Sequence, residues 1–488
     1  MTPYATVRLA LAGTSTDRLR VVLTAVSALP ATFALLAAAN VVAIHGDGGE
    51  SGPPGWAARY GTELLREGGL RPGTAFTLFL LAVPLLALTG QCIRLGSPQR
   101  DRRLAALRLA GATPAQAVLI AAGETFVAAL AGTLAGLVAY LWVHGVVHPR
   151  DRSGLLVLPS DLLPPVWAMA LIVVGGPLAA GGLGAVLLRR VVITPLGVVR
   201  RVRDRPPRAW AGPCLMGGGA LIAGLDALLH LPRAVTAVVG VAGVLLLVVG
   251  VVVGVGWISH TAGRLLVRYG RRASTLLAGR RLLADPWTGS RTLATVYAAV
   301  IVGAGVLAVR ALIVTQFAAE DETNRLTHGL ADDVDPERGF HLHTFQLITV
   351  VVALVLVFAG AGVLVALVEG IVARRRAYAA MTATGVPRRS LAAALAWQSF
   401  APLVPGLLVS LAVGCFAVRA VGFGTATGGA VCTDPPVRCS PIVVRAVPVP
   451  VGQLALLGGG ALLVMLLVVA VAAVVLRAAT DVEELRAG

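Results

Sequence analysis

One stretch of this sequence occurs twice and decides how the chain is organised: RRLAALRLAGAT at residues 102–113 and RAYAAMTATGVP at residues 376–387. Each copy places two apolar side chains and a glycine at the spacing i, i+3 and i+7. This spacing predicts a short helix with one apolar stripe, and arginines lie on its flanks. The glycine follows the stripe and favours a turn into the next segment. The duplication predicts that one structural unit occurs twice.

Long apolar segments surround both copies. Of the 488 residues, 57% are hydrophobic and 13% are charged, and the mean hydropathy is +0.84. Soluble chains are less apolar and carry about 25% charged residues, so the composition excludes a soluble or disordered protein. Segments of about 20 residues cross a bilayer as helices. Ten such spans are predicted, at residues 21–45, 72–93, 115–145, 164–188, 211–230, 235–258, 293–315, 345–368, 392–418 and 452–476.

The duplication extends over these spans. The alignment that pairs Arg102 with Arg376 and Gly111 with Gly385 also lays the second and third spans on the eighth and ninth. We therefore predict an all-α integral membrane protein with ten transmembrane helices, arranged as two four-helix repeats around a central helix pair. The repeats would occupy residues 1–190 and 276–488, with the central pair in 191–275. Both repeats would run in the same direction, as in parallel-repeat transporters.

The charges set the orientation. All 41 basic residues are arginine, and 29 of them fall between spans on the side that contains the N-terminus. The positive-inside rule makes this side cytoplasmic, so both termini are predicted to lie in the cytoplasm and the protein in the plasma (inner) membrane. The net charge of +17 then reflects topology and attraction to anionic membrane lipids, so no nucleic-acid partner is predicted.

The chain contains no lysine, and this limits the chemistry that it can perform. A P-loop needs a lysine, so this chain cannot hold one, and any ATP would be bound and hydrolysed by another chain. No catalytic set, cofactor site or metal-ligand cluster stands out, and we predict that the protein is not an enzyme. The glycine triplets at 217–219 and 458–460 lie in predicted spans, where glycine favours close helix packing.

Two acidic residues, Glu124 and Asp226, lie within predicted spans. Ionisable groups are costly in a membrane and are often functional. Glu124 either forms a structural pair or takes part in coupling or transport. For Asp226 we favour an ion pair at the outer surface, because His230 and Arg233 are close in sequence.

The last predicted outer loop contains Cys432 and Cys439, separated by a segment that includes Pro435 and Pro436. The outer side is oxidising, and the two prolines favour a turn that would bring the thiols together. A local disulfide is therefore predicted, and two free thiols are the alternative.

The arginine-rich start, the run LRLAGAT at 107–113 and the following apolar span with Glu124 resemble the FtsX-like permease domain of ABC transporters, the MacB/FtsX class. Residues 374–418 resemble a second, more diverged copy. The resemblance implies that each short helix is a coupling helix that contacts a separate cytoplasmic ABC ATPase dimer. The coupling residues would be Arg102, Leu104, Leu107, Arg108, Gly111, Ala112 and Thr113 in the first copy, and Arg376, Tyr378, Met381, Gly385, Val386 and Pro387 in the second.

The resemblance further implies the permease subunit of an ABC transporter. It would move a lipid, a lipopeptide or a hydrophobic or antimicrobial compound across or out of the membrane. Two alternatives are a secondary transporter driven by an ion gradient, with Glu124 as the coupling acid, and a non-transporting subunit that transmits force or signals. The layout resembles the bacitracin-export-type permeases more than the four-span family members, but the outer loops 46–71 and 316–343 are too short for a separate domain. The sequence does not show whether one copy of this chain or two copies form the complete transporter.

Overall fold

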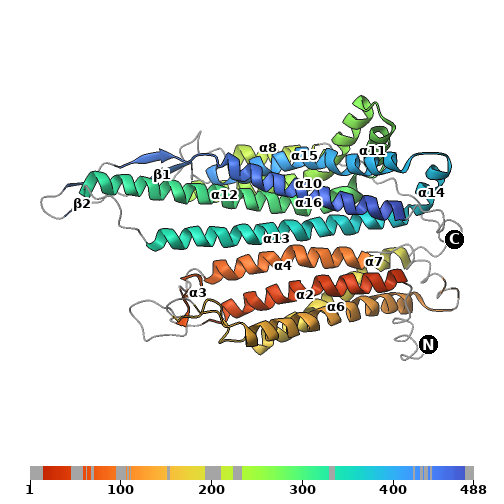
Figure 1. Cartoon of the computed structure of the whole chain (residues 1–488), viewed down its shortest axis with the longest axis horizontal. Helices are drawn as coiled ribbons and strands as arrows, with labels where there is room; N and C mark the ends of the chain where they lie inside the picture. The colour runs from red at the N-terminus through yellow and green to blue at the C-terminus, as the bar shows by residue number, and fades with distance from the viewer. Residues whose placement is uncertain are drawn as a thin grey trace. The chain divides into compact units, whose positions relative to one another are not determined.

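The described residues of the computed structural model are helical apart from two short strand pairs and the segments that connect these elements (Figure 1). Among the residues it describes, eight helices are long and apolar enough to cross a membrane, so the chain is a multi-pass membrane protein. These helices correspond to eight of the ten predicted spans. The described residues are 15–44, 59–61, 63–66, 71–94, 106, 109, 111–150, 154–192, 210–223, 233–328, 336–420, 424–428, 432–433, 438–439 and 442–478.

The other two predicted spans, 72–93 and 211–230, are not among these eight helices. Helix α4 (Arg71–Arg94) has 24 residues, which gives a length of about 36 Å and suffices for the predicted span 72–93. Helix α8 (Ala211–Ala223) has 13 residues and covers only the first part of the predicted span 211–230. The remainder of that span, with Asp226, lies outside the described residues. The count of ten spans therefore stays a prediction.

The chain divides into two compact units, one with residues 1–202 and 368–373 and the other with residues 203–367 and 374–488. In the first unit, α4 packs with three helices in one bundle. They are α2 (Ser15–Val42), α6 (Pro114–Val146) and α7 (Val166–Val192). Helix α2 contacts both α4 and α6, and α6 packs along α7, as Figure 1 shows.

An arginine holds together the predicted outer end of the first unit. Arg71 is buried at the start of α4, next to the short helix α3 (Glu63–Arg66). Its Nε donates to the Leu65 carbonyl at 2.7 Å, and its Nη1 donates to the Ile44 carbonyl at 3.0 Å. The Leu65 carbonyl lies in α3 and the Ile44 carbonyl lies just after the end of α2. One guanidinium therefore satisfies backbone acceptors from two elements.

Tyr60 forms a second contact at this end. Its hydroxyl donates to Asp161 Oδ1 at 2.6 Å, and Asp161 Oδ2 lies 3.5 Å from Arg59 Nη1. Burial, together with the hydrogen bond to Asp161, raises the pKa of the Tyr60 hydroxyl well above its ordinary value. The Gly61 amide donates to the Leu156 carbonyl at 2.9 Å. The segments at residues 59–61 and 156–161, which are far apart in sequence, therefore pack together at this end of the first unit.

In the second unit, the core surrounds Tyr297, which is fully buried. Its hydroxyl donates to the Pro402 carbonyl at 2.7 Å. Besides α8, the described helices of this unit are α10 (Arg233–Tyr269), α11 (Ala273–Ala284), α12 (Pro286–His328), α13 (Pro336–Ala373, up to residue 367), α14 (Arg375–Ala383), α15 (Arg388–Ala420) and α16 (Val451–Ala478). Helix α10 contacts α12 and α15, so the central region packs with the second repeat.

Helices α8 and α10 approach closely through glycines. A Cβ atom at Gly219 would lie 2.6 Å from the Leu247 amide nitrogen, and one at Gly250 would lie 2.7 Å from the Met216 nitrogen. The predicted packing role of the first glycine triplet is therefore confirmed for Gly219. It is wrong for residues 217–218, because no atom of the described residues lies within 4 Å of a Cβ placed at either position.

Matched features occur at equivalent positions of the two copies. Helices α6 and α15 both have 33 residues, and the alignment that pairs Gly111 with Gly385 also pairs their first residues, Pro114 and Arg388. Each helix follows a glycine with a positive φ, 93° at Gly111 and 89° at Gly385. Only glycine adopts this conformation without strain, so the turn explains why both copies of the stretch carry glycine there. These features agree with the predicted repeat.

A β-hairpin covers the predicted outer end of α12. Strand β1 (Thr425–Thr427) pairs antiparallel with β4 (Val444–Ala446). Arg445 on β4 forms an ion pair with Glu322 on α12. A Cβ at Gly428 would lie 2.6 Å from the Ala319 carbonyl oxygen, so the hairpin lies directly on the helix.

The predicted disulfide gains support from strand register. Strands β2 (Cys432–Thr433) and β3 (Arg438–Cys439) are antiparallel, and Cys432 is the direct partner of Cys439. Directly paired residues in antiparallel strands have Cα atoms about 4.5–5.5 Å apart, within the range that a disulfide requires. We expect this loop's peptide, from protein purified without reductant, to be about 2 Da lighter than after reduction. Peptide mass spectrometry measures this, and alkylation of both thiols without prior reduction would contradict it.

Candidate coupling helix and membrane grooves

Helix α14 is the described copy of the predicted coupling helix. It ends in a Schellman motif, in which the Gly385 amide donates to the Thr382 carbonyl at 3.0 Å and the Val386 amide to the Met381 carbonyl at 3.0 Å. Pro387 follows this turn and precedes α15. The glycine turn therefore joins α14 directly to a predicted membrane span.

Tyr378 fixes α14 to α11. The tyrosine is 3% exposed, and Arg281 Nη1 donates to its hydroxyl oxygen at 2.6 Å. The guanidinium carbon of Arg281 also lies 4.7 Å from the ring centroid, which is a cation–π contact. At the end of α11, Asp285 Oδ2 lies 3.9 Å from Arg374 Nη2, which forms an ion pair. Two contacts thus connect α11 with α14.

This geometry corrects one expected role. The resemblance places Tyr378 on the docking surface, but the side chain is buried against Arg281 and serves to position the helix. Met381 and Val386 are half-buried, and the exposed face of α14 and its turn is formed by other residues. The exposed residues are Arg375, Arg376, Ala377, Ala380, Ala383, Thr384, Gly385 and Pro387. The aromatic member of the apolar stripe thus packs on a helix of the same chain.

The first copy is described only in part. Arg102, Leu104, Leu107 and Arg108 lie outside the described residues. Gly111 forms the turn, and Ala112 follows it.

Thr113 then caps α6 by forming a capping box. Its side chain accepts from the Gln116 amide at 3.3 Å, and Gln116 Oε1 accepts from the Thr113 amide at 3.0 Å. Thr113 therefore sets where the following helix starts. Leu109, which the stripe does not include, is 91% exposed.

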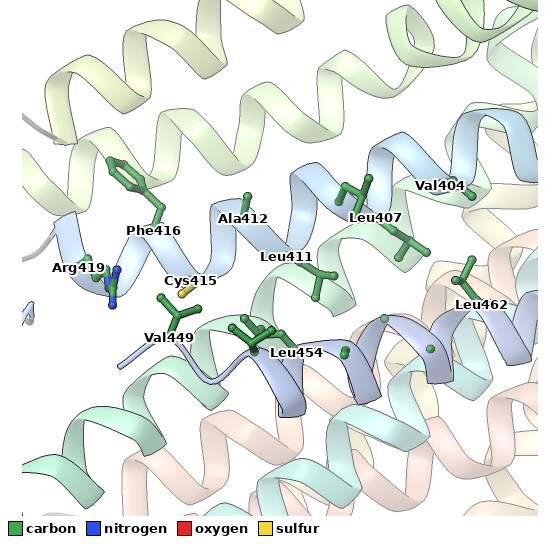
Figure 2. Close-up of a pocket in the computed structure, with 15 residues that line it drawn as sticks. Val404, Leu407, Leu411, Ala412, Cys415, Phe416, Arg419, Val449, Leu454 and Leu462 are labelled. Atoms are coloured by element: carbon green, nitrogen blue, oxygen red, sulfur yellow. The ribbon is translucent and has the colours of Figure 1, made fainter. Parts of the chain in front are cut away.

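Two apolar grooves flank α16. The first lies between α15 and α16 and has a volume of about 610 Å³ (Figure 2). Figure 2 shows Arg419 and Val449 at one end of this groove and Val404 and Leu462 at the other. Arg419 Nη2 donates to the Val447 carbonyl at 2.7 Å, so the arginine ties α15 to the loop that precedes α16.

The second groove is lined by α12, α13 and α16 and has a volume of about 510 Å³. Arg310, Gln346, Thr349 and Gln453 are its polar lining residues, and the rest of the lining is apolar or glycine.

The second glycine triplet separates the two grooves. A Cβ placed on Gly458 would lie 3.1 Å from Leu411, which confirms the close packing predicted there. The prediction is wrong for Gly459 and Gly460, because within the described part of the chain nothing lies within 4 Å of a Cβ at either position. Gly459 lines the first groove and Gly460 the second, so the missing side chains leave room for both.

The comparison with known families agrees with this duplicated geometry. The FtsX-like permease C-terminal family matches residues 75–196 and 349–480, which together make up just over half of the chain. The chain belongs to the FtsX-like permease family. This family comprises membrane components of ABC-type permeases. No curated protein and no solved structure matches this FtsX-like permease.

The two family segments of this FtsX-like permease contain both copies of the repeated stretch. Their first residues, 75 and 349, are separated by the same interval as Gly111 and Gly385, so the family match and the repeated stretch have one register. Glu124 lies in the first segment, is 7% exposed, and makes an interaction within the protein. Its assignment to pairing or to coupling stays a prediction, and Asp226 lies outside the described residues.

Proposed function

We propose that this FtsX-like permease is the membrane subunit of an ABC transporter that moves a lipid, a lipopeptide or another hydrophobic or antimicrobial compound. ATP hydrolysis resides in a separate cytoplasmic ATPase dimer, which docks on the exposed face of α14 and on residues 102–113. The protein lies in the plasma membrane with both termini in the cytoplasm. The observation that carries this proposal is the left-handed glycine turn that leads into a 33-residue helix, present in each family segment.

The contacts of α14 explain how force would reach the membrane. A push on α14 acts on α15 through the Gly385 turn and on α11 through Tyr378. Helix α15 packs against α12 and α16, which line the two grooves. Closure of the ATPase dimer would therefore change the width of a groove that a hydrophobic compound can occupy.

The docking proposal is tested by putting acidic side chains on exposed alanines. We expect Ala377→Glu with Ala380→Glu to reduce the ATPase that co-purifies with the tagged permease by at least about tenfold, because two desolvated charges would face the interface. Both alanines are exposed, so the fold should remain intact. The amount of ATPase per permease, measured by quantitative mass spectrometry of complexes from native membranes, gives the result.

Ala273→Glu is the matched control, because it places the same charge on an exposed alanine of α11. Full ATPase recovery with the control and loss with the double variant supports docking on α14. Full recovery with the double variant, or equal loss with the control, would show that α14 is not the docking element.

A further inference from the structure

The groove between α12, α13 and α16 contains an unusual arginine. Arg310 lies inside the predicted span 293–315 and is half-buried. Within the described part of the chain no acidic side chain forms an ion pair with it. A charged group in a membrane is costly unless it reaches water or pairs with an opposite charge. Because most of the groove lining is apolar, the positive charge of Arg310 needs a compensating negative charge.

The polar residues of the groove gather at one end. From Gly303 to Arg310, α12 runs toward the predicted outer end, whereas α13 and α16 begin at that end. Gly303 meets Val352 and Leu457 at one level; counted outward from there, Arg310, Gln346 and Gln453 lie about 10, 9 and 6 Å away, within about one helical turn of each other in depth. The three helices thus bring one guanidinium and two amides to the predicted outer end of the groove.

The apolar part of the groove extends inward from this polar end. Gly303 and Gly460 each lie two helical turns, or about 10 Å, deeper than the polar residue of their helix. A Cβ at Gly303 would lie 2.8 Å from Val352 Cγ1 and 3.0 Å from Leu457 Cδ2, so the three helices converge there. The groove therefore has a polar mouth and an apolar floor.

We infer that this groove binds an anionic membrane phospholipid from the outer leaflet, with its phosphate at Arg310 and an acyl chain along Gly460. The guanidinium is the complement of a phosphate and the amides can donate to its oxygens. The volume of about 510 Å³ suits one chain rather than a whole lipid. Binding requires only this groove, and the further step that the bound amphiphile is transported rests on the proposed function.

The other groove does not offer the same site. Arg419 at its end already donates to the Val447 carbonyl, and no glutamine lines that groove. This difference supplies a control, because Gly459 and Gly460 are neighbours on α16 that face different grooves. A leucine at either position enters open space, since nothing lies within 4 Å of a Cβ there.

The test uses the full-length protein in nanodiscs with phosphatidylglycerol or phosphatidylcholine that carry a photoreactive diazirine in one acyl chain. We expect phosphatidylglycerol to label α12 or α16 peptides in this groove about fivefold more than phosphatidylcholine with the same chains. Arg310→Gln should abolish this preference, and Arg310→Lys should keep most of it. Gly460→Leu should remove the label, whereas Gly459→Leu should leave it unchanged. Peptide mass spectrometry locates the label without requiring an ATPase, so a failed docking test does not affect the result.

Three results would overturn the inference. Equal labelling by the two lipids in the wild type would remove the anionic preference, and undiminished labelling of Gly460→Leu would place the chain elsewhere. Competition by soluble glycerol 3-phosphate at millimolar concentration would indicate a site for a free phosphate instead of a lipid. If Arg310→Gln fails to fold, as shown by its elution from a size-exclusion column, the comparison of the two glycine variants decides.

Discussion

Replacing Gly132 with alanine is expected to lower the stability of the first unit by about 1–3 kcal/mol or more, because the added methyl group meets backbone that cannot move aside. A Cβ at Gly132 would lie 2.8 Å from the Ala25 Cα and 2.8 Å from the Ala28 Cβ on α2. One turn later, a Cβ at Gly136 would lie 2.7 Å from the Leu29 carbonyl oxygen. The two glycines allow α2 and α6 to pack in close contact. Thermal unfolding of the detergent-solubilised protein, followed by fluorescence-detected size exclusion, measures the loss.

The equivalent glycine of the second repeat supplies an internal check. A Cβ at Gly406 would lie 2.6 Å from Tyr297 Cε1, so here the obstacle is a side chain. We expect Gly406→Ala to be destabilising as well, and Tyr297→Leu in the same chain to restore part of the loss. Gly459→Ala, which meets nothing within 4 Å, should leave the unfolding temperature unchanged. Additive effects of Gly406→Ala and Tyr297→Leu would mean that the predicted clash does not exist.

Much of the membrane architecture can be predicted from sequence, because two physical constraints are local. A helix that crosses a bilayer needs about 20 apolar residues, and this is visible in composition alone. A turn with positive φ needs glycine, so Gly111 and Gly385 mark both turns in the sequence itself. Both features depend on a few consecutive residues and not on what packs against them.

The candidate site is harder to predict, because its contacts join distant parts of the chain. The helical spacing assigns Tyr378 to the apolar stripe and the resemblance assigns it to the docking surface, but no signal in its own helix shows that Arg281, 97 residues earlier, covers it. The packing around the glycine triplet on α16 is equally hard to predict from sequence. Its sequence favours close packing, but only the positions of the neighbouring helices determine that Gly459 and Gly460 face open grooves.

The contact between Tyr378 and Arg281 leads to the second large effect. We expect Tyr378→Ala to raise the hydrogen-exchange rate of the α14 amides by about tenfold or more. The buried ring, its hydrogen bond and its cation–π contact are the described interactions that hold α14 on α11, apart from the long ion pair between Asp285 and Arg374. Hydrogen-exchange mass spectrometry of the peptide 375–383 measures the change, and it requires neither a substrate nor an ATPase.

Two variants separate anchoring from a general weakening of the helix. Tyr378→Phe keeps the ring beneath the Arg281 guanidinium and loses only the hydroxyl, so its exchange rate should lie between those of the wild type and Tyr378→Ala. Arg376→Gln removes a charge from the exposed face of α14 and should leave exchange unchanged. If Tyr378→Ala exchanges at the wild-type rate, α14 is held in place by other contacts. If Tyr378→Ala exchanges faster and also recovers less ATPase, the anchoring of α14 is what presents its exposed face for docking, because Tyr378 itself is too deeply buried to touch a partner.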